Sequence, residues 1–151
     1  MRLTPPATTV EAPKEPPKKD RSPEARWTPA LAKNGWTPVV DDFLDNYAEL
    51  GITPGEAMLI VHLMRHKWDK NAPYPGFETL GRQMGITPTS VRNHVRSLEK
   101  KKLLVREMRV SQTNKFHLTP LFERLEKHVA AKPKKVKEPE FDVNAALAKA
   151  A

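Results

Sequence analysis

The feature that most constrains this chain is the stretch at residues 77–98, FETLGRQMGITPTSVRNHVRSL. Its apolar residues recur at three- and four-residue spacing, which is typical of amphipathic helices. Gly85 stands where a first helix has to stop, because glycine adopts a positive φ at little cost. Thr87 suits the N-cap of a second helix, with Pro88 at the first position, where a missing N–H group does no harm. The stretch therefore predicts a helix, a tight turn and a second helix. The apolar positions are Leu80, Met84, Ile86, Val91, Val95 and Leu98.

The second of these helices leaves a set of polar side chains facing outward. In a helix-turn-helix this helix lies in the major groove of DNA and presents its N-terminal residues to base edges. Arginine pairs with guanine and asparagine with adenine, each pair being worth about 1–3 kcal/mol of discrimination. Cationic residues at the end of the helix suit phosphate. The predicted DNA-binding residues of the helix are Thr89, Ser90, Arg92, Asn93, Arg96, Lys100 and Lys101.

The charge of the chain is distributed unevenly. The 151 residues carry a net charge of +8, and the sequence pI is near 9.8, which favours a polyanionic partner. Residues 36–86 hold four Lys/Arg against seven Asp/Glu, whereas residues 87–118 hold eight against two. A merely solubilising charged face is the alternative. We favour a basic binding side, because the surplus coincides with the helix described above and the segment that follows it.

Helices are predicted on both sides of this stretch. A helical pattern starts at Pro38 and stops at Gly51, with Val40, Phe43, Leu44, Tyr47 and Leu50 on its apolar face. Thr53 and Glu56 form a capping box that opens a core helix, whose apolar stripe is Ala57, Ile60, Val61, Met64 and Trp68. A last helix opens with Thr119 as cap and Pro120 next to it. It packs on the domain or pairs with a second copy of the chain, and the sequence leaves both alternatives open.

Residues 104–110 and 115–118 are predicted to form a β-hairpin with a polar tip at residues 111–114. Met108 and Val110 are expected to share a face with Phe116 and Leu118. Whether the side chain of Arg106 points outward stays open, because Arg106 and Met108 are two residues apart and so lie on the same face of the strand. In this position the hairpin is a wing, and the predicted fold class is mainly α with a small β-hairpin wing. The predicted DNA contacts of the wing are Arg109, Gln112, Thr113, Asn114 and Lys115.

The predicted domain covers residues 36–131 and lies between two tails. Residues 1–35 hold seven of the 15 prolines and many Lys and Glu, so we expect them to be disordered. Trp27 and Trp36 stand in two Trp-Thr-Pro repeats, and we expect the rings to pack on the domain rather than to mark a partner site. Residues 132–140 are a basic linker. Residues 141–151 are a short peptide with Asp142 as a cap, either a frayed tail or a docking segment for a protein partner.

The sequence offers little for catalysis or metal binding. There is no cysteine, no Gly-rich phosphate loop and no serine elbow motif. His62 and His66 stand four residues apart on the core helix, but no third ligand is placed to complete a metal site. We expect no enzyme activity, no cofactor and no metal. No apolar run is long enough to span a bilayer, so the expected location is cytoplasmic and nucleoid-associated.

Residues 53–130 resemble the winged helix-turn-helix domain found in plasmid and phage replication initiators and in small bacterial transcriptional regulators. The residues that carry the resemblance are PGFETLGRQMGITPTSVRNHVRSLEKKKLL and TNKFHLTPLFERLEKH. The resemblance implies that Thr89, Ser90, Arg92, Asn93 and Arg96 face the groove. The chain departs from the pattern at Lys102, where such domains often have glycine.

The sequence thus predicts a non-catalytic protein that binds double-stranded DNA sequence-specifically, in the first place a transcriptional regulator. The first alternative is an initiator-like or accessory protein in the replication of a plasmid, phage or mobile element. The second is a winged-helix module that binds proteins. The expected partners are duplex DNA, a protein at residues 141–151 and a second copy of the chain.

Overall fold

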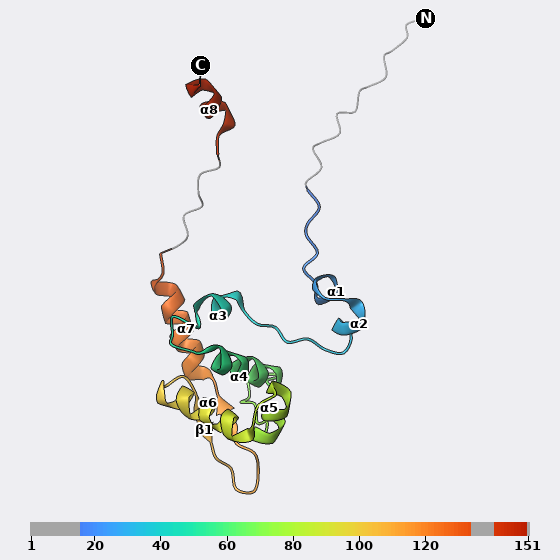
Figure 1. Cartoon of the computed structure of the whole chain (residues 1–151), viewed down its shortest axis with the longest axis vertical. Coiled ribbons are helices and arrows are strands. Elements are labelled where there is room, and N and C mark those ends of the chain that lie inside the picture. The colour runs from blue at the N-terminus through green and yellow to red at the C-terminus, as the bar shows by residue number, and fades with distance from the viewer. Residues whose placement is uncertain (1–15, 134–140, 151) are drawn as a thin grey trace, which may run out of the picture. The chain divides into compact units, whose positions relative to one another are not determined.

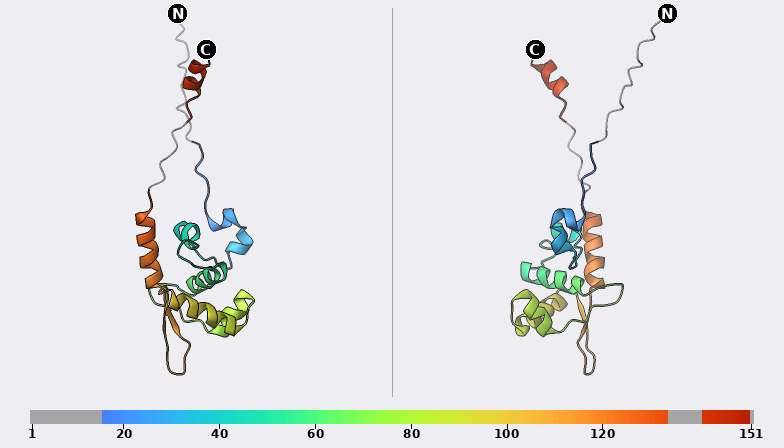
Figure 2. Two further views of the ribbon diagram at one scale, coloured as in Figure 1. Left: turned by 60° about the vertical axis from the view of Figure 1, so that its left-hand side comes forward. Right: turned by 90° about the vertical axis from the view of Figure 1, so that its right-hand side faces the viewer.

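The computed structural model describes residues 16–133 and 141–150 of the chain. It divides into two compact units at the boundary between Trp36 and Thr37, which are described separately below. Figures 1 and 2 show the helices and strands.

The first unit contains two one-turn helices, α1 (Pro23–Arg26) and α2 (Pro29–Ala32). Each has proline at its start and a hydroxyl cap before it, from Ser22 and Thr28. Ser-Pro and Thr-Pro pairs favour such single turns, because they supply a cap and a preset φ. The expectation that the tail is disordered stays a prediction. The expectation for residues 1–15 lies outside the described residues.

The two tryptophans of the Trp-Thr-Pro repeats are mostly exposed. Trp27 is 72% exposed and Trp36 is 60% exposed. The expectation that these rings pack on the domain stays a prediction. Thr28 of the first repeat caps a helix, but Thr37 of the second does not.

The second unit is mainly helical with one small hairpin, which confirms the predicted fold class. Its helices are α3 (Asp41–Asn46), α4 (Pro54–Arg65), α5 (Phe77–Met84), α6 (Pro88–Lys100) and α7 (Thr119–Ala131). Strands β1 (Val105–Glu107) and β2 (Lys115–His117) pair antiparallel. A short helix, α8 (Val143–Lys149), starts at Asp142, whose carboxylate accepts hydrogen bonds from the backbone of Asn144 and Ala145, as the predicted cap requires.

The core is built where α4, α5 and α6 meet and extends to α7. Helix α6 buries Val91, Val95 and Leu98, as the spacing predicted. They join one cluster with Leu59 and Leu63 of α4 and with other buried side chains. Burying a side chain of this size contributes about 1.5–3 kcal/mol, so this face of α6 fixes which of its sides stays outside.

The turn between α5 and α6 is formed as predicted. Gly85 has φ +69° and ends α5, and the hydroxyl of Thr87 accepts a hydrogen bond from the backbone of Ser90. Gly81 lies so close to the turn that a Cβ there would be 2.7 Å from the carbonyl oxygen of Ile86. The turn therefore needs Gly81 as well as Gly85, which the sequence did not reveal.

The hairpin is shorter than predicted. Its register places Arg106 opposite Phe116, and residues 108–114 form the connecting loop. Met108 is 79% exposed and Val110 is 93% exposed, so the expectation that they share a buried face with Phe116 and Leu118 was wrong. These two residues leave the sheet because pairing stops at Glu107. Figures 1 and 2 show the loop projecting away from the helices.

Helices α3 and α4 also end earlier than the pattern indicated. Helix α3 ends at Asn46, and Val40 and Leu44 are exposed while Phe43 is buried. Helix α4 ends at Arg65, so Trp68 lies beyond it and is 91% exposed instead of lying on the core stripe. In both cases the apolar spacing continued past the residue at which the backbone turns.

Two further boundaries concern caps. Leu118, not Thr119, is the N-cap of α7, and it has no side-chain cap hydrogen bond, so the predicted Thr119 cap was wrong. Lys102, at the position where similar domains often have glycine, has φ +58°. This left-handed conformation turns the chain from the end of α6 toward β1.

Candidate nucleic-acid interface

One face of α6 carries an exposed polar stripe. Thr89, Arg92, Asn93, Arg96 and Lys100 are all exposed and recur at three- and four-residue spacing, so they lie on one side of the helix. Because Val91, Val95 and Leu98 hold the opposite side in the core, the stripe faces outward. It combines three cations with an amide and a hydroxyl, which are groups that bind phosphates and base edges.

The first turn of α6 is held by its cap. Besides its bond to the backbone of Ser90, the hydroxyl of Thr87 lies 2.9 Å from the hydroxyl of Ser90. Ser90 is half-buried, so it supports the cap more than it projects outward. Thr89 is the exposed hydroxyl at this end of the helix.

The position of Arg92 is set by a neighbouring helix. Its guanidinium carbon lies 5.4 Å from the centre of the Phe77 ring at the start of α5, a favourable cation–π distance. Phe77 in turn lies 6.1 Å, centre to centre, from the ring of Phe116 in β2. A chain of contacts thus links the exposed stripe to the base of the wing.

The wing loop is tied to the extended segment before α5. Arg109 donates a hydrogen bond of 2.8 Å from Nε to the carbonyl oxygen of Thr113, and its guanidinium lies 5.3 Å from the centre of the Tyr74 ring. The hydroxyl of Thr113 donates to the carbonyl oxygen of Tyr74. A small cleft of about 220 Å³ separates the loop from Gly76 and Phe77. These contacts give the loop a defined position beside α5.

The remaining wing residues differ in accessibility. Gln112 and Thr113 are exposed, whereas Asn114 and Lys115 are half-buried. Glu107 lies 2.7 Å from the ring of His117, and this hydrogen bond lowers the pKa of Glu107. Arg106 is turned toward α6, where its Nε is 3.0 Å from a carboxylate oxygen of Glu99. The structure therefore assigns Arg106 to an internal ion pair and places Gln112 at the surface.

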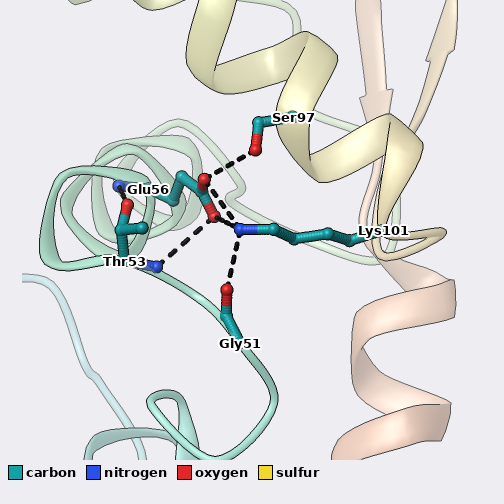
Figure 3. Close-up of polar contacts among 5 residues, drawn as sticks. All are labelled: Gly51, Thr53, Glu56, Ser97 and Lys101. Carbon is teal, nitrogen blue, oxygen red and sulfur yellow. Dashed lines mark hydrogen bonds and ion pairs between the residues drawn. The ribbon is translucent and has the colours of Figure 1, made fainter.

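Two adjacent lysines at the end of α6 have different surroundings, and Figure 3 shows those of Lys101. Lys100 is exposed on the stripe, but Lys101 turns back toward α4. The ammonium of Lys101 donates to the carbonyl oxygen of Gly51 at 2.7 Å and to the two carboxylate oxygens of Glu56 at 2.9 and 2.7 Å. This arrangement disfavours the predicted phosphate contact of Lys101, because a buried carboxylate holds its ammonium.

The partner of Lys101 is the Glu56 of the capping box at the start of α4. Glu56 is buried and also accepts a hydrogen bond of 2.8 Å from the hydroxyl of Ser97 in α6. Its Oε2 accepts from the backbone N–H of Thr53, and the hydroxyl of Thr53 accepts in return from the backbone N–H of Glu56. Glu56 thus joins the first turn of α4 to the last turns of α6.

Burial, the largest single effect on Glu56, raises its pKa. Hydrogen bonds from Lys101, Ser97 and the Thr53 backbone together outweigh burial, so the net pKa is lowered from its ordinary value of 4.5. A carboxyl whose pKa is lower in the folded chain stabilises that chain above its unfolded pKa. This stabilisation is lost as the pH falls through the folded value.

We therefore expect Glu56→Gln to remove part of the acid sensitivity of the fold. The free energy of unfolding of the wild type should exceed that of the variant most at neutral pH, and the gap should narrow as the pH falls below about 4.5. Urea unfolding between neutral pH and pH 3 measures the gap. Glu123→Gln removes an exposed carboxylate and is the control. Its free energy of unfolding should change with pH in parallel with that of the wild type. A constant gap for Glu56→Gln would contradict the assignment.

Several residues of this region were not singled out from the sequence. Phe77 and Tyr74 support cations, and Gly81 and Ser97 hold the helices together. Glu56 was predicted as part of the capping box, but its bonds to α6 were not predicted. Tyr74 had one usable signal, because an aromatic residue between two prolines in a polar loop needs a packing partner. The contacts of Ser97 and Lys101 join residues more than 40 positions apart and left no local signal.

The two histidines that the sequence placed four residues apart, His62 and His66, have different surroundings. His66 lies 3.1 Å from the amide oxygen of Gln83, and burial, together with the charges of Arg65 and His66, lowers the pKa of His62. Among residues 16–133 and 141–150, no three His, Asp or Glu side chains are grouped as metal ligands. In the same part of the chain, every helix is too short or too polar to cross a bilayer.

Comparison with known proteins assigns the family. A family model described as the DnaD N-terminal domain matches residues 39–137, which is well over half of the chain. The crystal structure of the N-terminal domain of the DnaD protein from Geobacillus kaustophilus HTA426 is 24% identical, with a TM-score of 0.55 over 67% of this chain and 86% of that chain. This likeness supports the fold.

The YusO protein from Bacillus subtilis is 19% identical, with a TM-score of 0.41 over 73% of this chain and 84% of that chain, a likeness too low to support an inference. No curated protein matches the chain. The match to the family model covers α3 to α7, including the helix-turn-helix and the hairpin. The chain therefore belongs to the DnaD N-terminal domain family.

Proposed function

We propose that this chain is a non-catalytic, replication-associated protein whose winged-helix unit binds duplex DNA through α6 and the wing. The observation that carries the proposal is the exposed stripe of Arg92, Asn93 and Arg96, with Arg92 held over Phe77. A helix presented in this way matches the shape and the hydrogen-bonding groups of the major groove. The wing loop is held by contacts with Tyr74, and we assign it to the neighbouring backbone or minor groove.

Family membership favours replication over transcriptional regulation. The first prediction from the sequence was a regulator, although a helix-turn-helix is common to both roles. The DnaD N-terminal domain family points to replication, and it agrees with the initiator-like alternative. Genome-wide mapping of bound DNA separates the two roles. Sites gathered at an origin support the proposal, and sites gathered at promoters contradict it.

The dependence of DNA affinity on salt tests the phosphate contacts. The face carries the cations Arg92, Arg96, Lys100, Arg109 and Lys115, of which Arg92 is assigned to bases. Three to four phosphate contacts predict that the affinity for duplex DNA falls roughly a hundredfold between 50 and 200 mM salt. An affinity that hardly changes over this range would exclude the proposed interface.

We expect Arg92→Ala and Asn93→Ala to relax sequence preference. Each loses a side chain assigned to a base edge, so affinity for the preferred site should fall by about 1–3 kcal/mol while affinity for random duplex changes little. Selection of bound sequences followed by titration of each variant measures both quantities. Lys100→Ala is the matched control and should weaken all sequences about equally. Equal losses from all three variants would mean that α6 does not read the groove.

The second candidate function is protein binding through the wing. It is favoured by one observation, the exposed apolar pair Met108 and Val110 at the loop. Met108→Ser with Val110→Ser separates the candidates. Unchanged DNA affinity with loss of a replication partner would favour protein binding. The predicted pairing with a second copy stays a prediction.

A further inference from the structure

We propose that helix α8 docks in an apolar groove formed by α3, α4 and α7 of the same chain. This inference concerns a face distinct from the α6 stripe and does not depend on DNA binding. It begins from the groove, which has a volume of about 540 Å³. Apolar side chains line it almost throughout, among them Phe43, Ile60, Val61, Met64, Leu125 and Val129. A hollow of this size and composition is typical of a binding site.

Helix α8 carries the complementary surface. Val143 and Leu147 stand four residues apart and so lie on the same side of the helix, with Phe141 just before its start. All three side chains are exposed in the structure. A seven-residue helix is too short to persist alone in water. An amphipathic helix of this kind is stabilised when its apolar side enters a groove.

The tether between the two has a suitable length. Helix α7 ends at Ala131, and Val129 and Ala130 already line the groove. The ten residues from Ala131 to Phe141 reach at most about 35 Å, and the 13 residues of α7 extend only about 20 Å. Phe141 can therefore reach either end of the groove. A short tether gives an effective concentration near the millimolar range, so even a weak contact is well occupied.

Charge favours the same arrangement. Among the groove's lining residues the charged ones are Asp42 and Glu126, both acidic. Helix α8 carries Lys149 in its last turn. Attraction between such exposed charges is small and orients the helix more than it holds it. The apolar contacts of Phe141, Val143 and Leu147 would supply most of the binding.

The test uses the full chain and exploits the absence of cysteine. Ala150→Cys accepts a single spin label at the end of α8, and methyl signals of Ile60, Val61 and Leu125 report on the groove. We expect these signals to lose most of their intensity, equally in concentrated and in dilute samples. No loss of intensity would overturn the proposal.

Two variants test the docking face of α8, and one mixture tests whether docking occurs within one chain. Leu147→Glu places a charge on the docking face and should restore the signals, whereas Ala148→Glu adds the same charge on another side and should not. If the methyl signals of Leu147→Glu still lost their intensity, the assigned docking face would be contradicted. A mixture of isotope-labelled and spin-labelled chains tests for a second copy. Broadening that arises only between different chains would replace docking within one chain by exchange between two.

Discussion

Replacing Lys101 with alanine is expected to lower the free energy of unfolding by about 1–3 kcal/mol while leaving the DNA contacts of the folded chain intact. The ammonium of Lys101 pairs with the buried carboxylate of Glu56, and its loss leaves that charge with only Ser97 and the Thr53 backbone. The side chain of Lys101 is itself partly exposed, so solvent screening keeps the loss below that of a fully buried pair. Urea unfolding measures the change.

The neighbouring residue supplies a matched control. Lys100→Ala removes the same charge one position away, from the exposed stripe. It should leave the free energy of unfolding within about 0.5 kcal/mol of the wild type. It should also lower the slope of log affinity against log salt by about one contact. If Lys101→Ala instead weakened DNA binding without changing stability, its ammonium would have to leave Glu56 when DNA binds.

Replacing Gly81 with alanine is expected to lower the free energy of unfolding by about 2 kcal/mol, even though alanine favours a helix by about 1 kcal/mol. The added Cβ would lie 2.7 Å from the carbonyl oxygen of Ile86 and 3.3 Å from the nitrogen of Pro88. Both are backbone atoms of the turn, so relief requires α5 and α6 to move apart. Binding to DNA by the fraction that remains folded should weaken as well.

Gly55→Ala is the control for this substitution. A Cβ at Gly55 would lie 2.9 Å from Cε1 of His94, which is the end of a side chain that can rotate away. The free energy of unfolding should therefore change by less than about 1 kcal/mol. If Gly81→Ala proved as mild as Gly55→Ala, the turn would be able to widen, and the close approach at Gly81 would not constrain it.

The sequence predicted the parts of the fold that local chemistry determines. Gly85 and Thr87 end one helix and begin the next through interactions within a few residues, so their pattern located the turn. The four- and three-residue spacing of Val91, Val95 and Leu98 likewise predicted which side of α6 is buried. The exposed positions Thr89, Arg92, Asn93 and Arg96 followed from that.

What the sequence did not predict depends on partners distant in the chain. Nothing near Lys101 indicates that its ammonium meets Glu56, and nothing near Arg92 indicates the Phe77 ring. The predicted length of the hairpin was wrong for a related reason. Alternation alone placed Met108 on a strand, although pairing stops at Glu107. Strand length depends on the partner strand, and helix length in α3 depends on how the chain turns toward α4.

The ion pair between Glu56 and Lys101 gives α6 a fixed pivot at one end (Figure 3). The 13 residues of α6 extend about 20 Å from that pivot to the first turn. A tilt of about 5° at the pivot would displace Thr89 by nearly 2 Å, which is more than a hydrogen bond tolerates. The residues at the far end of α6 therefore help to hold its first turn in position, although we assign none of them to DNA.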